Sequence, residues 1–401
     1  MKLAILGATG SIGQSAARLA EAFPDKLQIT ALTCARNVEK LAADIMRFRP
    51  EAAAVRGPDE RKKLAALLKA AGLKPTPHIL CGEKGQIAAA TETGADVVLS
   101  AIAGGAGLPP TMAAAKRGLK VALANKESLV MAGDLVMAAA ARAGAAIIPV
   151  DSEHSAIFQA FGGNLAGRNV RRLILTASGG PFRGLKAPAL ETVSRAAALA
   201  HPRWAMGPKV TCDSATMMNK GLELIEAHHL FSIDYDRLEV LVHPQSVVHS
   251  IVEYVDGSQL AQLGPADMRL PLAYAFSHPE RWPLLPDRPG RGLKGYRPLE
   301  LAGAKGRLTF EKPDRATFRA LALAENAGRV GGTAPAILSG ANEEAVDLFL
   351  AGVIGFADIT RLVEKTLEAI PSAPLKNVGE AVAAANEAKR LAKGLSLELL
   401  R

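Results

Sequence analysis

The sequence predicts an α/β protein with a parallel sheet in its amino-terminal part and a helical carboxyl-terminal region. Short apolar runs alternate with longer helix-like segments over the first 150 residues, which is typical of a sheet with helices on both faces. A glycine-rich stretch joins the first run to the first helix. From Asp314 onward the chain reads as helices. At 401 residues it exceeds the size of one hydrophobic core, so two or three domains are expected.

The composition excludes several classes of protein. A hydrophobic fraction of 49% with 22% charged residues is typical of a soluble globular chain, and no apolar run approaches the roughly 20 residues of a membrane helix. The four-residue apolar run after Lys2 is too short for a signal peptide, so we expect a cytoplasmic protein without a membrane partner. Cys34, Cys81 and Cys212 are widely separated and form no CxxC pair, which predicts reduced thiols in packed surroundings.

The net charge of +9 favours anionic partners. The basic residues are spread along the chain without a dense block, and only 4% of the residues are aromatic, which leaves few rings for base stacking. We therefore expect small phosphorylated ligands and no nucleic acid.

The first apolar run, residues 3–6, is a short strand of the buried type, and it leads into the glycines of residues 7–13. A helix-like segment follows at 14–22, which completes the strand, loop and helix of a dinucleotide-binding motif. Glycines let the backbone approach a pyrophosphate, and the amides at the helix start stabilise its charge. Because the spacing is GxxGxxG rather than GxGxxG, a glycine-rich turn without a ligand is the alternative.

The second strand, residues 27–33, ends where an NAD enzyme usually carries an acidic residue that binds the ribose. No acid is present there, and Arg36 offers a guanidinium suited to a 2′-phosphate. The segment favours NADP over NAD. A solvated surface arginine is the alternative.

Further apolar runs at 96–102, 119–124 and 145–150 alternate with helix-like segments such as 61–71 and 129–143. In open parallel sheets, ligands bind at the carboxyl ends of the strands. We therefore expect the polar residues that follow the 119–124 strand to face a cofactor or substrate, although an ordinary helix entrance would look the same. They are Asn125, Lys126 and Glu127.

Two acids follow the next strand. Asp151 and Glu153 are two residues apart, and in an extended segment their side chains would point to the same side. Convergent carboxylates suit Mg²⁺ or Mn²⁺, which prefer oxygen ligands. A loop acid followed by a helix cap is the alternative.

Two irregular stretches follow in the middle of the chain. Residues 176–182 are rich in glycine after an apolar strand, and their amides and hydroxyls would suit a phosphate as well as a tight turn. Residues 201–209 contain two prolines and a glycine, which preclude a regular helix, together with Trp204. That composition indicates an active-site lid, with a packed loop around a satisfied His201 as the alternative.

The densest polar cluster is at 212–227. Ser214, Asn219 and Lys220 are donors of the kind that hold phosphate and sugar hydroxyls, and Glu223 lies one helical turn beyond Lys220 or Asn219. Spacing alone does not distinguish Glu223 from Glu226, and a capped, solvated amphipathic helix is the alternative. Residues 243–249 are strand-like, and we expect their histidines to be structural.

Taken together, these segments resemble the 1-deoxy-D-xylulose 5-phosphate reductoisomerase family. The motifs are GATGSIG at 7–13, NKES at 125–128, DSEHSA at 151–156, SGGPF at 178–182, HPRWAMG at 201–207 and SATMMNKGLE at 214–223. The resemblance implies a Rossmann-type NADPH domain at 1–150, an α+β catalytic, metal-binding and dimerisation domain at 151–285, a linker at 286–312 and a C-terminal α-helical domain at 313–401. It also implies a homodimer.

The resemblance also assigns roles to individual positions. The implied cofactor contacts are Thr9, Gly10, Ser11, Ile12, Ala35, Arg36, Asn37, Asn125, Glu127 and Gly207. The implied metal ligands are Asp151, Glu153 and Glu223, which selects Glu223 over Glu226. The implied substrate contacts are Lys126, Ser152, Glu153, Ser178, His201, Ser214, Asn219, Lys220 and Glu223. Among these, Lys126, Asp151, Glu153, His201 and Glu223 are the implied catalytic residues.

The implied reaction rearranges a phosphorylated keto-sugar on Mg²⁺ or Mn²⁺ and then reduces the branched aldehyde with NADPH, giving 2-C-methyl-D-erythritol 4-phosphate for isoprenoid precursors by the non-mevalonate pathway. The rival interpretations are an NADP-dependent sugar-phosphate or semialdehyde dehydrogenase and a catalytically silent NADPH-binding regulator. The first is disfavoured because simple hydride transfer does not require three convergent acids. The second is disfavoured because the polar residues are intact at every motif. Ala35 and Ala177 stand where the family often has glycine or another small residue, without removing a functional side chain.

Overall fold

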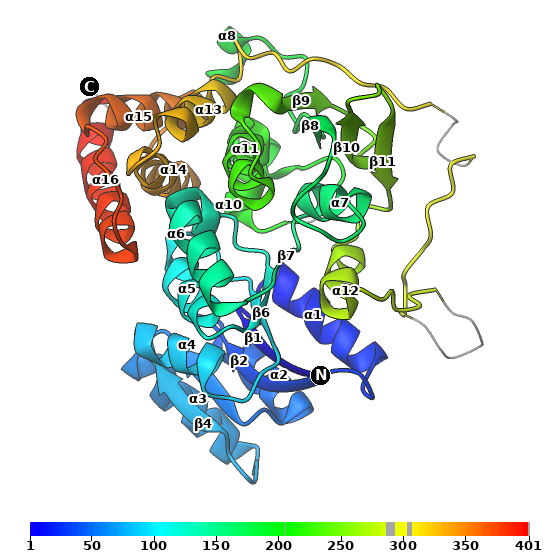
Figure 1. The fold of residues 1–401 in the computed structure, drawn as a ribbon. Coiled ribbons are helices and arrows are strands. Elements are labelled where there is room, and N and C mark those ends of the chain that lie inside the picture. The colour runs from blue at the N-terminus through cyan, green and yellow to red at the C-terminus, as the bar shows by residue number, and fades with distance from the viewer. Residues whose placement is uncertain (205, 286–292, 303–306, 400–401) are drawn as a thin grey trace. The chain divides into compact units, whose positions relative to one another are not determined.

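The computed structural model describes residues 1–204, 206–285, 293–302 and 307–399 (Figure 1). Ala205 of the expected lid and residues 286–292 and 303–306 of the expected linker lie outside the described residues. The chain divides into two compact units. Unit 1 contains Met1–Ser128, Val136–Ser155 and Met268–Arg297. Unit 2 contains Leu129–Leu135, Ala156–Asp267 and Pro298–Arg401.

Unit 1 is built on a parallel sheet of seven strands in the order β4-β3-β2-β1-β5-β6-β7. The strands are β1 Lys2–Leu6, β2 Gln28–Thr33, β3 Ala52–Val55, β4 His78–Cys81, β5 Val97–Ser100, β6 Lys120–Leu123 and β7 Ile147–Pro149. The central strands are apolar on both faces, as parallel strands covered by helices must be, and Leu3 and Ile5 are fully buried. The predicted parallel α/β sheet is confirmed.

The strand order reverses at β1, because β2, β3 and β4 extend the sheet on one side and β5, β6 and β7 on the other. Right-handed crossovers therefore place the two sets of helices on opposite faces of the sheet. The helices are α1 Ser11–Ala22, α2 Val38–Phe48, α3 Pro58–Ala70, α4 Gly82–Thr91, α5 Leu108–Lys116, α6 Glu127–Ala143 and α12 Arg269–Ser277. A 3-10 turn, η1 Gly105–Gly107, precedes α5.

Unit 2 contains a mixed sheet of four strands in the order β11-β10-β8-β9. The strands are β8 Val170–Ala177, β9 Leu238–Val242, β10 Val248–Tyr254 and β11 Gln259–Leu263. β8 pairs with β9 in parallel and with β10 antiparallel. Ile174, Val248 and Ile251 form an apolar cluster on this sheet.

The expectation of a strand over 243–249 was wrong for its first five residues, which form a turn between β9 and β10. The ring of His243 holds this turn, because Nε2 accepts the backbone N–H groups of Val247 and Val248 at 3.1 and 3.2 Å and Nδ1 donates to the carbonyl of Thr309 at 2.9 Å. His243 is therefore the structural histidine that the sequence predicts.

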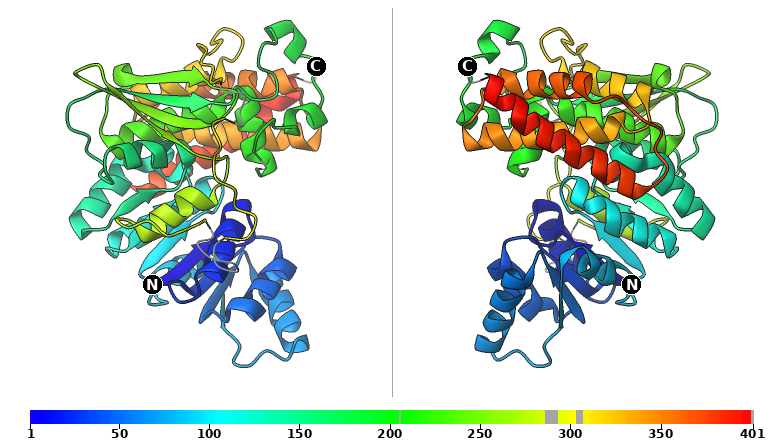
Figure 2. Two further views of the ribbon diagram at one scale, coloured as in Figure 1. Left: turned by 90° about the vertical axis from the view of Figure 1, so that its right-hand side faces the viewer. Right: turned by 90° about the vertical axis from the view of Figure 1, so that its left-hand side faces the viewer.

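Helices make up the rest of unit 2, and Figure 2 shows those of the carboxyl-terminal region grouped together in orange to red. They are α8 Ala187–Leu190, α9 Arg195–Leu199, α10 Pro208–Thr216, α11 Met218–Phe231, α13 Ala320–Val330, α14 Ala334–Ala351, α15 Phe356–Ala369 and α16 Val378–Leu399, with α7 Ser152–Ala160 entering from unit 1 and a 3-10 turn η2 Tyr235–Arg237. α14 packs against both α15 and α16. The predicted carboxyl-terminal helices are confirmed.

Within the described residues, no helix combines the length and the apolar character needed to cross a membrane. Two of the thiols are packed as expected, since Cys34 and Cys212 are buried. Burial, with nearby acids adding to it, raises the pKa of Cys34 to about 11 and that of Cys212 to about 12. Cys81 is half-buried.

Candidate active site

The glycine loop after β1 packs closely on other backbone at two of its glycines and leaves space beside the third, where a ligand would approach. A Cβ at Gly7, whose φ is +85°, would lie 2.4 Å from the carbonyl oxygen of Ala101, and one at Gly13 would lie 2.5 Å from that of Ala8. A Cβ at Gly10 would meet nothing closer than 3.4 Å. Gly10 is the N-cap of α1 and offers no side-chain cap, so the first amides of α1 can bind an anion. The loop fits the pyrophosphate of a dinucleotide.

The turn after β2 lies beside this loop. The hydroxyl of Thr33 accepts the N–H of Gly7 at 2.9 Å, which holds the end of β2 against the loop. Arg36 is exposed at the turn, and the side chain of Asn37 caps α2 by accepting the N–H of Lys40 at 3.1 Å. Arg36 is therefore exposed to solvent just after a strand end that is bonded to the glycine loop.

Asn125 is 2% exposed and fixes two strand-end loops to each other. Its Nδ2 donates to the carbonyl oxygens of Ile102 at 2.7 Å and Gly104 at 3.0 Å and to Glu127 at 3.0 Å, while its Oδ1 accepts the N–H of Ser128 at 2.9 Å. The side chain expected to face a ligand thus makes contacts within the protein. It places the start of α6, with Lys126 and Glu127, at the carboxyl edge of the sheet.

Lys126 and Asp151 follow neighbouring strands and form an ion pair with Nζ and Oδ2 2.9 Å apart. The two side chains are 12% and 14% exposed. Burial raises the pKa of Asp151, but Lys126 and then His154, whose Nδ1 lies 3.7 Å from the same oxygen, outweigh burial and hold that pKa well below its usual range. Asp151 is therefore ionised at neutral pH.

The backbone around the two acids differs from the expectation. We predicted an extended segment, but the carbonyl of Asp151 accepts the N–H of Ser155 at 2.8 Å and α7 begins at Ser152. At about 100° per residue, side chains two apart on a helix do not share a face. Glu153 lies in the first turn of α7 and accepts a hydrogen bond from the hydroxyl of Ser152. The extended backbone was therefore the wrong reason, but the predicted convergence is confirmed, because a carboxylate oxygen of Asp151 and one of Glu153 lie within 4.8 Å of each other.

The polar cluster of 212–227 folds into two helices with a sharp corner between them. Met217 is the corner residue, with the left-handed φ of +67°. The hydroxyl of Thr216 fixes the corner by bonding the carbonyl of Cys212 at 3.2 Å and accepting the N–H of Met218 at 3.3 Å. Ser214 consequently lies in the last turn of α10, and α11 carries the remaining polar side chains.

α11 is buried over most of its length, which excludes the solvated amphipathic helix. Glu223 is fully buried, and both Asn219 and Lys220 donate to its carboxylate. The predicted spacing of one helical turn is confirmed. Glu226 is also fully buried one turn farther along. The choice of Glu223 over Glu226 as a ligand stays a prediction.

Ser178 and His201 are in contact, with Oγ and Nε2 3.0 Å apart. The other ring nitrogen of His201 accepts the backbone N–H groups of Arg203 at 3.2 Å and Trp204 at 2.8 Å. Burial lowers the pKa of His201, so the neutral ring must carry its proton on Nε2 and donate it to Ser178. The loop is irregular as predicted, and the ring of Trp204 lies 6.1 Å from that of His249.

Gly180 brings the Ser178 loop against α10. Its φ is +68°, and a Cβ there would lie 2.7 Å from the carbonyl oxygen of Ser214. Only glycine allows this approach without a shift of the backbone. Ser178, His201 and Ser214 are therefore placed by direct contact of two backbone segments.

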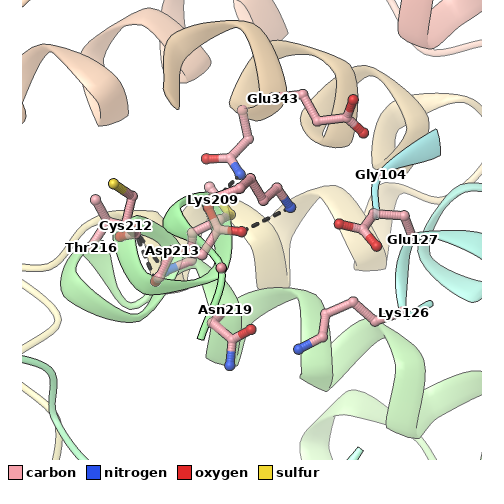
Figure 3. A network of polar contacts seen from close by, with 12 residues as sticks. Gly104, Lys126, Glu127, Lys209, Cys212, Asp213, Thr216, Asn219 and Glu343 are labelled. Carbon is pink, nitrogen blue, oxygen red and sulfur yellow. Dashed lines mark hydrogen bonds and ion pairs between the residues drawn. The ribbon is translucent and has the colours of Figure 1, made fainter. Parts of the chain in front are cut away.

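A buried carboxylate that the sequence did not single out lies beside Ser214. Asp213 is 1% exposed and accepts Lys209 at 2.8 Å, as Figure 3 shows, and Asn342 of α14 at 2.8 Å. Lys209 and Asp213 are four residues apart on α10, a spacing that could have indicated the pair. Nothing in the sequence indicates Asn342, which is remote along the chain.

The fold and these residues define an enzyme with a dinucleotide-binding α/β region and a set of buried acids and lysines. Sequence models of three descriptions match the chain: 1-deoxy-D-xylulose 5-phosphate reductoisomerase over residues 3–133, the C-terminal domain of 1-deoxy-D-xylulose 5-phosphate reductoisomerase over 147–231, and the DXP reductoisomerase C-terminal domain over 263–391. The chain belongs to the 1-deoxy-D-xylulose 5-phosphate reductoisomerase family.

Individual relatives agree over nearly the full length. The 1-deoxy-D-xylulose 5-phosphate reductoisomerase of Anaeromyxobacter dehalogenans is 50% identical over 98% of this chain and 96% of its own. The solved enzyme of Zymomonas mobilis, in complex with NADPH, is 43% identical with a TM-score of 0.85, covering 98% of both chains. A crystal structure of DOX-P reductoisomerase in complex with NADPH, fosmidomycin and magnesium is 41% identical with a TM-score of 0.90, covering 100% of this chain and 99% of the other.

Proposed function

We propose that this protein rearranges and reduces 1-deoxy-D-xylulose 5-phosphate to 2-C-methyl-D-erythritol 4-phosphate, using NADPH and Mg²⁺ or Mn²⁺, in the formation of isoprenoid precursors by the non-mevalonate pathway. The observation that carries the proposal is the buried Lys126–Asp151 pair at the carboxyl edge of a dinucleotide-binding sheet. The family to which the chain belongs supports it, as do the NADPH, magnesium and fosmidomycin in solved relatives.

The acids suit a hard divalent cation. We assign Asp151, Glu153 and Glu223 as its ligands, because carboxylate oxygens are what Mg²⁺ and Mn²⁺ prefer. Asp151 is ionised, and donors on α11 hold Glu223 in place. When bound, the metal supplies a Lewis acid for charge developing on substrate oxygens, and NADPH supplies the hydride.

The remaining site residues bind and orient the substrate. Lys126 is the cation that we place at the ketone and hydroxyl end, together with Ser152 and Glu153. We place the phosphate on Ser178, Ser214, Asn219, Lys220 and His201. His201 acts there as a neutral donor, because burial lowers its pKa and Nδ1 is occupied by two backbone N–H groups. Closure of the lid over 201–207 would exclude water from the reacting carbon atoms.

The proposed NADPH site contains Thr9, Gly10, Ser11 and Ile12 at the pyrophosphate, Ala35, Arg36 and Asn37 at the adenosine phosphate, and Asn125, Glu127 and Gly207 along the rest of the cofactor. The open Gly10 and the uncapped start of α1 support the first group. We further propose a cytoplasmic homodimer, with domains at 1–150, 151–285 and 313–401 and a linker at 286–312.

The direct test is incubation with 1-deoxy-D-xylulose 5-phosphate, NADPH and Mg²⁺, with identification of the product by NMR. We expect 2-C-methyl-D-erythritol 4-phosphate and one NADPH consumed for each product molecule. Reduction without rearrangement of the carbon skeleton would favour the sugar-phosphate dehydrogenase interpretation instead.

The metal assignment has its own test. Treatment with a chelator should abolish turnover, and Glu223→Gln should weaken Mn²⁺ binding, measured by calorimetry, while the NADPH dissociation constant stays nearly unchanged. Removal of one carboxylate takes away a charged ligand but leaves the glycine loop intact. Full turnover in metal-stripped protein would contradict the assignment.

A further inference from the structure

We infer that Asn342, on α14 among the carboxyl-terminal helices, is a positioning residue for the substrate site and acts through Asp213 and Lys209 of α10. This inference depends on the proposed function only in taking Ser214 as a phosphate-binding residue. It gives the carboxyl-terminal helices a role in substrate binding.

The starting observation is that Asp213 is a nearly fully buried carboxylate with two donors from two separate segments. Its Oδ1 accepts Nδ2 of Asn342 at 2.8 Å, and its Oδ2 accepts Nζ of Lys209 at 2.8 Å. Burying a carboxylate costs folding free energy unless its oxygens accept hydrogen bonds. The loss of one donor leaves a buried charge that is only partly compensated. Asn342 and Lys209 therefore determine where Asp213 can lie.

The position of Asp213 in turn sets the position of Ser214. α10 begins at Pro208, directly after the loop 201–207, and ends at the left-handed Met217. Ser214 is the next residue after Asp213, and the close approach of Gly180 to its carbonyl joins it to the Ser178 loop. A small rotation of α10 would therefore move Ser214 relative to Ser178 and disturb the lid at its carboxyl end.

The geometry of Asn342 points to donation as its role. Asn342 is 1% exposed, and its Oδ1 has no hydrogen-bond partner within the described part of the chain. An unsatisfied buried acceptor is destabilising, and a leucine of similar size would avoid that penalty. The amide is thus favourable at this position only through the hydrogen bond that its Nδ2 gives to Asp213.

The test is Asn342→Leu in the full-length enzyme, with KM and kcat for 1-deoxy-D-xylulose 5-phosphate and the NADPH dissociation constant measured together. Because a hydrogen bond to a charged group is lost, we expect KM to rise about tenfold or more while NADPH binding changes less than about twofold. Ser339→Ala is the matched control, since Ser339 is 2% exposed on the same helix and its hydroxyl has no partner among the described residues. It should leave both quantities unchanged.

A second set of variants separates positioning from general packing. If the charge of Asp213 is what makes the amide of Asn342 necessary, Asn342→Leu should not raise KM further in a protein that already carries Asp213→Asn. The double variant should then have the same KM as Asp213→Asn alone. Lys209→Met removes the other donor to Asp213 and should also raise KM. This variant serves as the test if Asn342→Leu does not fold.

Three results would overturn the inference: an unchanged KM in Asn342→Leu, a parallel loss of NADPH binding, or additive effects in the double variant. Fosmidomycin affinity, measured by calorimetry with NADPH and Mg²⁺ present, gives the same comparison without turnover. A wild-type protein that binds fosmidomycin but does not convert the substrate would contradict the proposed function. The present inference would then be judged from the fosmidomycin affinities of the variants. A protein that does neither would overturn both.

Discussion

Burial acts in opposite ways on two side chains of the site. It raises the pKa of Asp151, but Lys126 and His154 outweigh it, so the carboxyl group stays ionised. Burial lowers the pKa of His201, and among the described residues no acid opposes this effect. Burial favours the neutral form at both positions, but the neighbours of Asp151 leave it an anion suited to a cation, whereas His201 stays a neutral hydrogen-bond donor suited to a phosphate.

At the residue scale, cofactor choice depends on Arg36. Its guanidinium is exposed beside the glycine loop, so Arg36→Ala should remove a charge-assisted contact to the 2′-phosphate without affecting the core. Such a contact contributes about 1.5–3 kcal/mol, so the preference for NADPH over NADH should fall by about tenfold or more. Dissociation constants for both cofactors check this. Equal binding of NADPH and NADH by the unmodified protein would refute it.

At the scale of elements, a left-handed corner and a close approach shape the proposed substrate side of the site. Met217 turns α10 into α11, and Gly180 lets the Ser178 loop reach α10. A left-handed non-glycine residue is strained, and such strain persists only where the surrounding structure holds it. These two backbone features bring together side chains from a loop and two helices.

Gly180→Ala tests this arrangement against a control in the same loop. Gly184 has a φ of +87°, but a Cβ there would meet nothing within 4 Å. Gly184→Ala should therefore cost only the left-handed strain, about 1 kcal/mol, whereas Gly180→Ala adds a backbone clash of about 1–3 kcal/mol. Denaturant unfolding and KM for the substrate check both variants. If the two variants have the same stability and the same KM, the contact between Gly180 and Ser214 does not hold the substrate side of the site in place.

The lid prediction belongs to the same scale. Loop 201–207 should close over bound substrate, with Trp204 packing on the ligand. Trp282, the other tryptophan in the sequence, packs in unit 1 on Phe23, with ring centroids 5.3 Å apart, so Trp282→Phe leaves Trp204 as the reporter. Fosmidomycin should then change the fluorescence and protect the loop from proteolysis. If neither changes, the loop is structural.

At the scale of the whole molecule, the chain builds two units from interleaved segments. Unit 1 takes α12 from far along the sequence, and that helix packs on α1, β6 and β7. The sheet of unit 2 ends at β11, whose outer edge has no partner strand among the described residues. An unpaired strand edge offers hydrogen-bonding groups to another chain.

We expect the protein to sediment as a homodimer of twice 41.9 kDa at micromolar concentration. Analytical ultracentrifugation over a range of concentrations measures this. Leu260, on β11 and exposed, is suited to a charge substitution, and Leu260→Lys should weaken a dimer formed through this sheet. A single species of 41.9 kDa across the range would contradict the prediction.

The sequence by itself determined the parallel sheet, the glycine loop after β1, the carboxyl-terminal helices and the one-turn relation of Glu223 to Lys220. These features depend on local periodicity, on glycine spacing and on helical geometry, all of which involve residues near one another in the chain. The tertiary structure decided the start of α7 at Ser152, the turn held by His243, the tautomer of His201 and the pairing of Asp213 with Asn342. The last three depend on partners remote in the sequence, namely Thr309, Ser178 and Asn342, and no local pattern encodes those contacts, because burial and partner geometry arise only when the chain has folded.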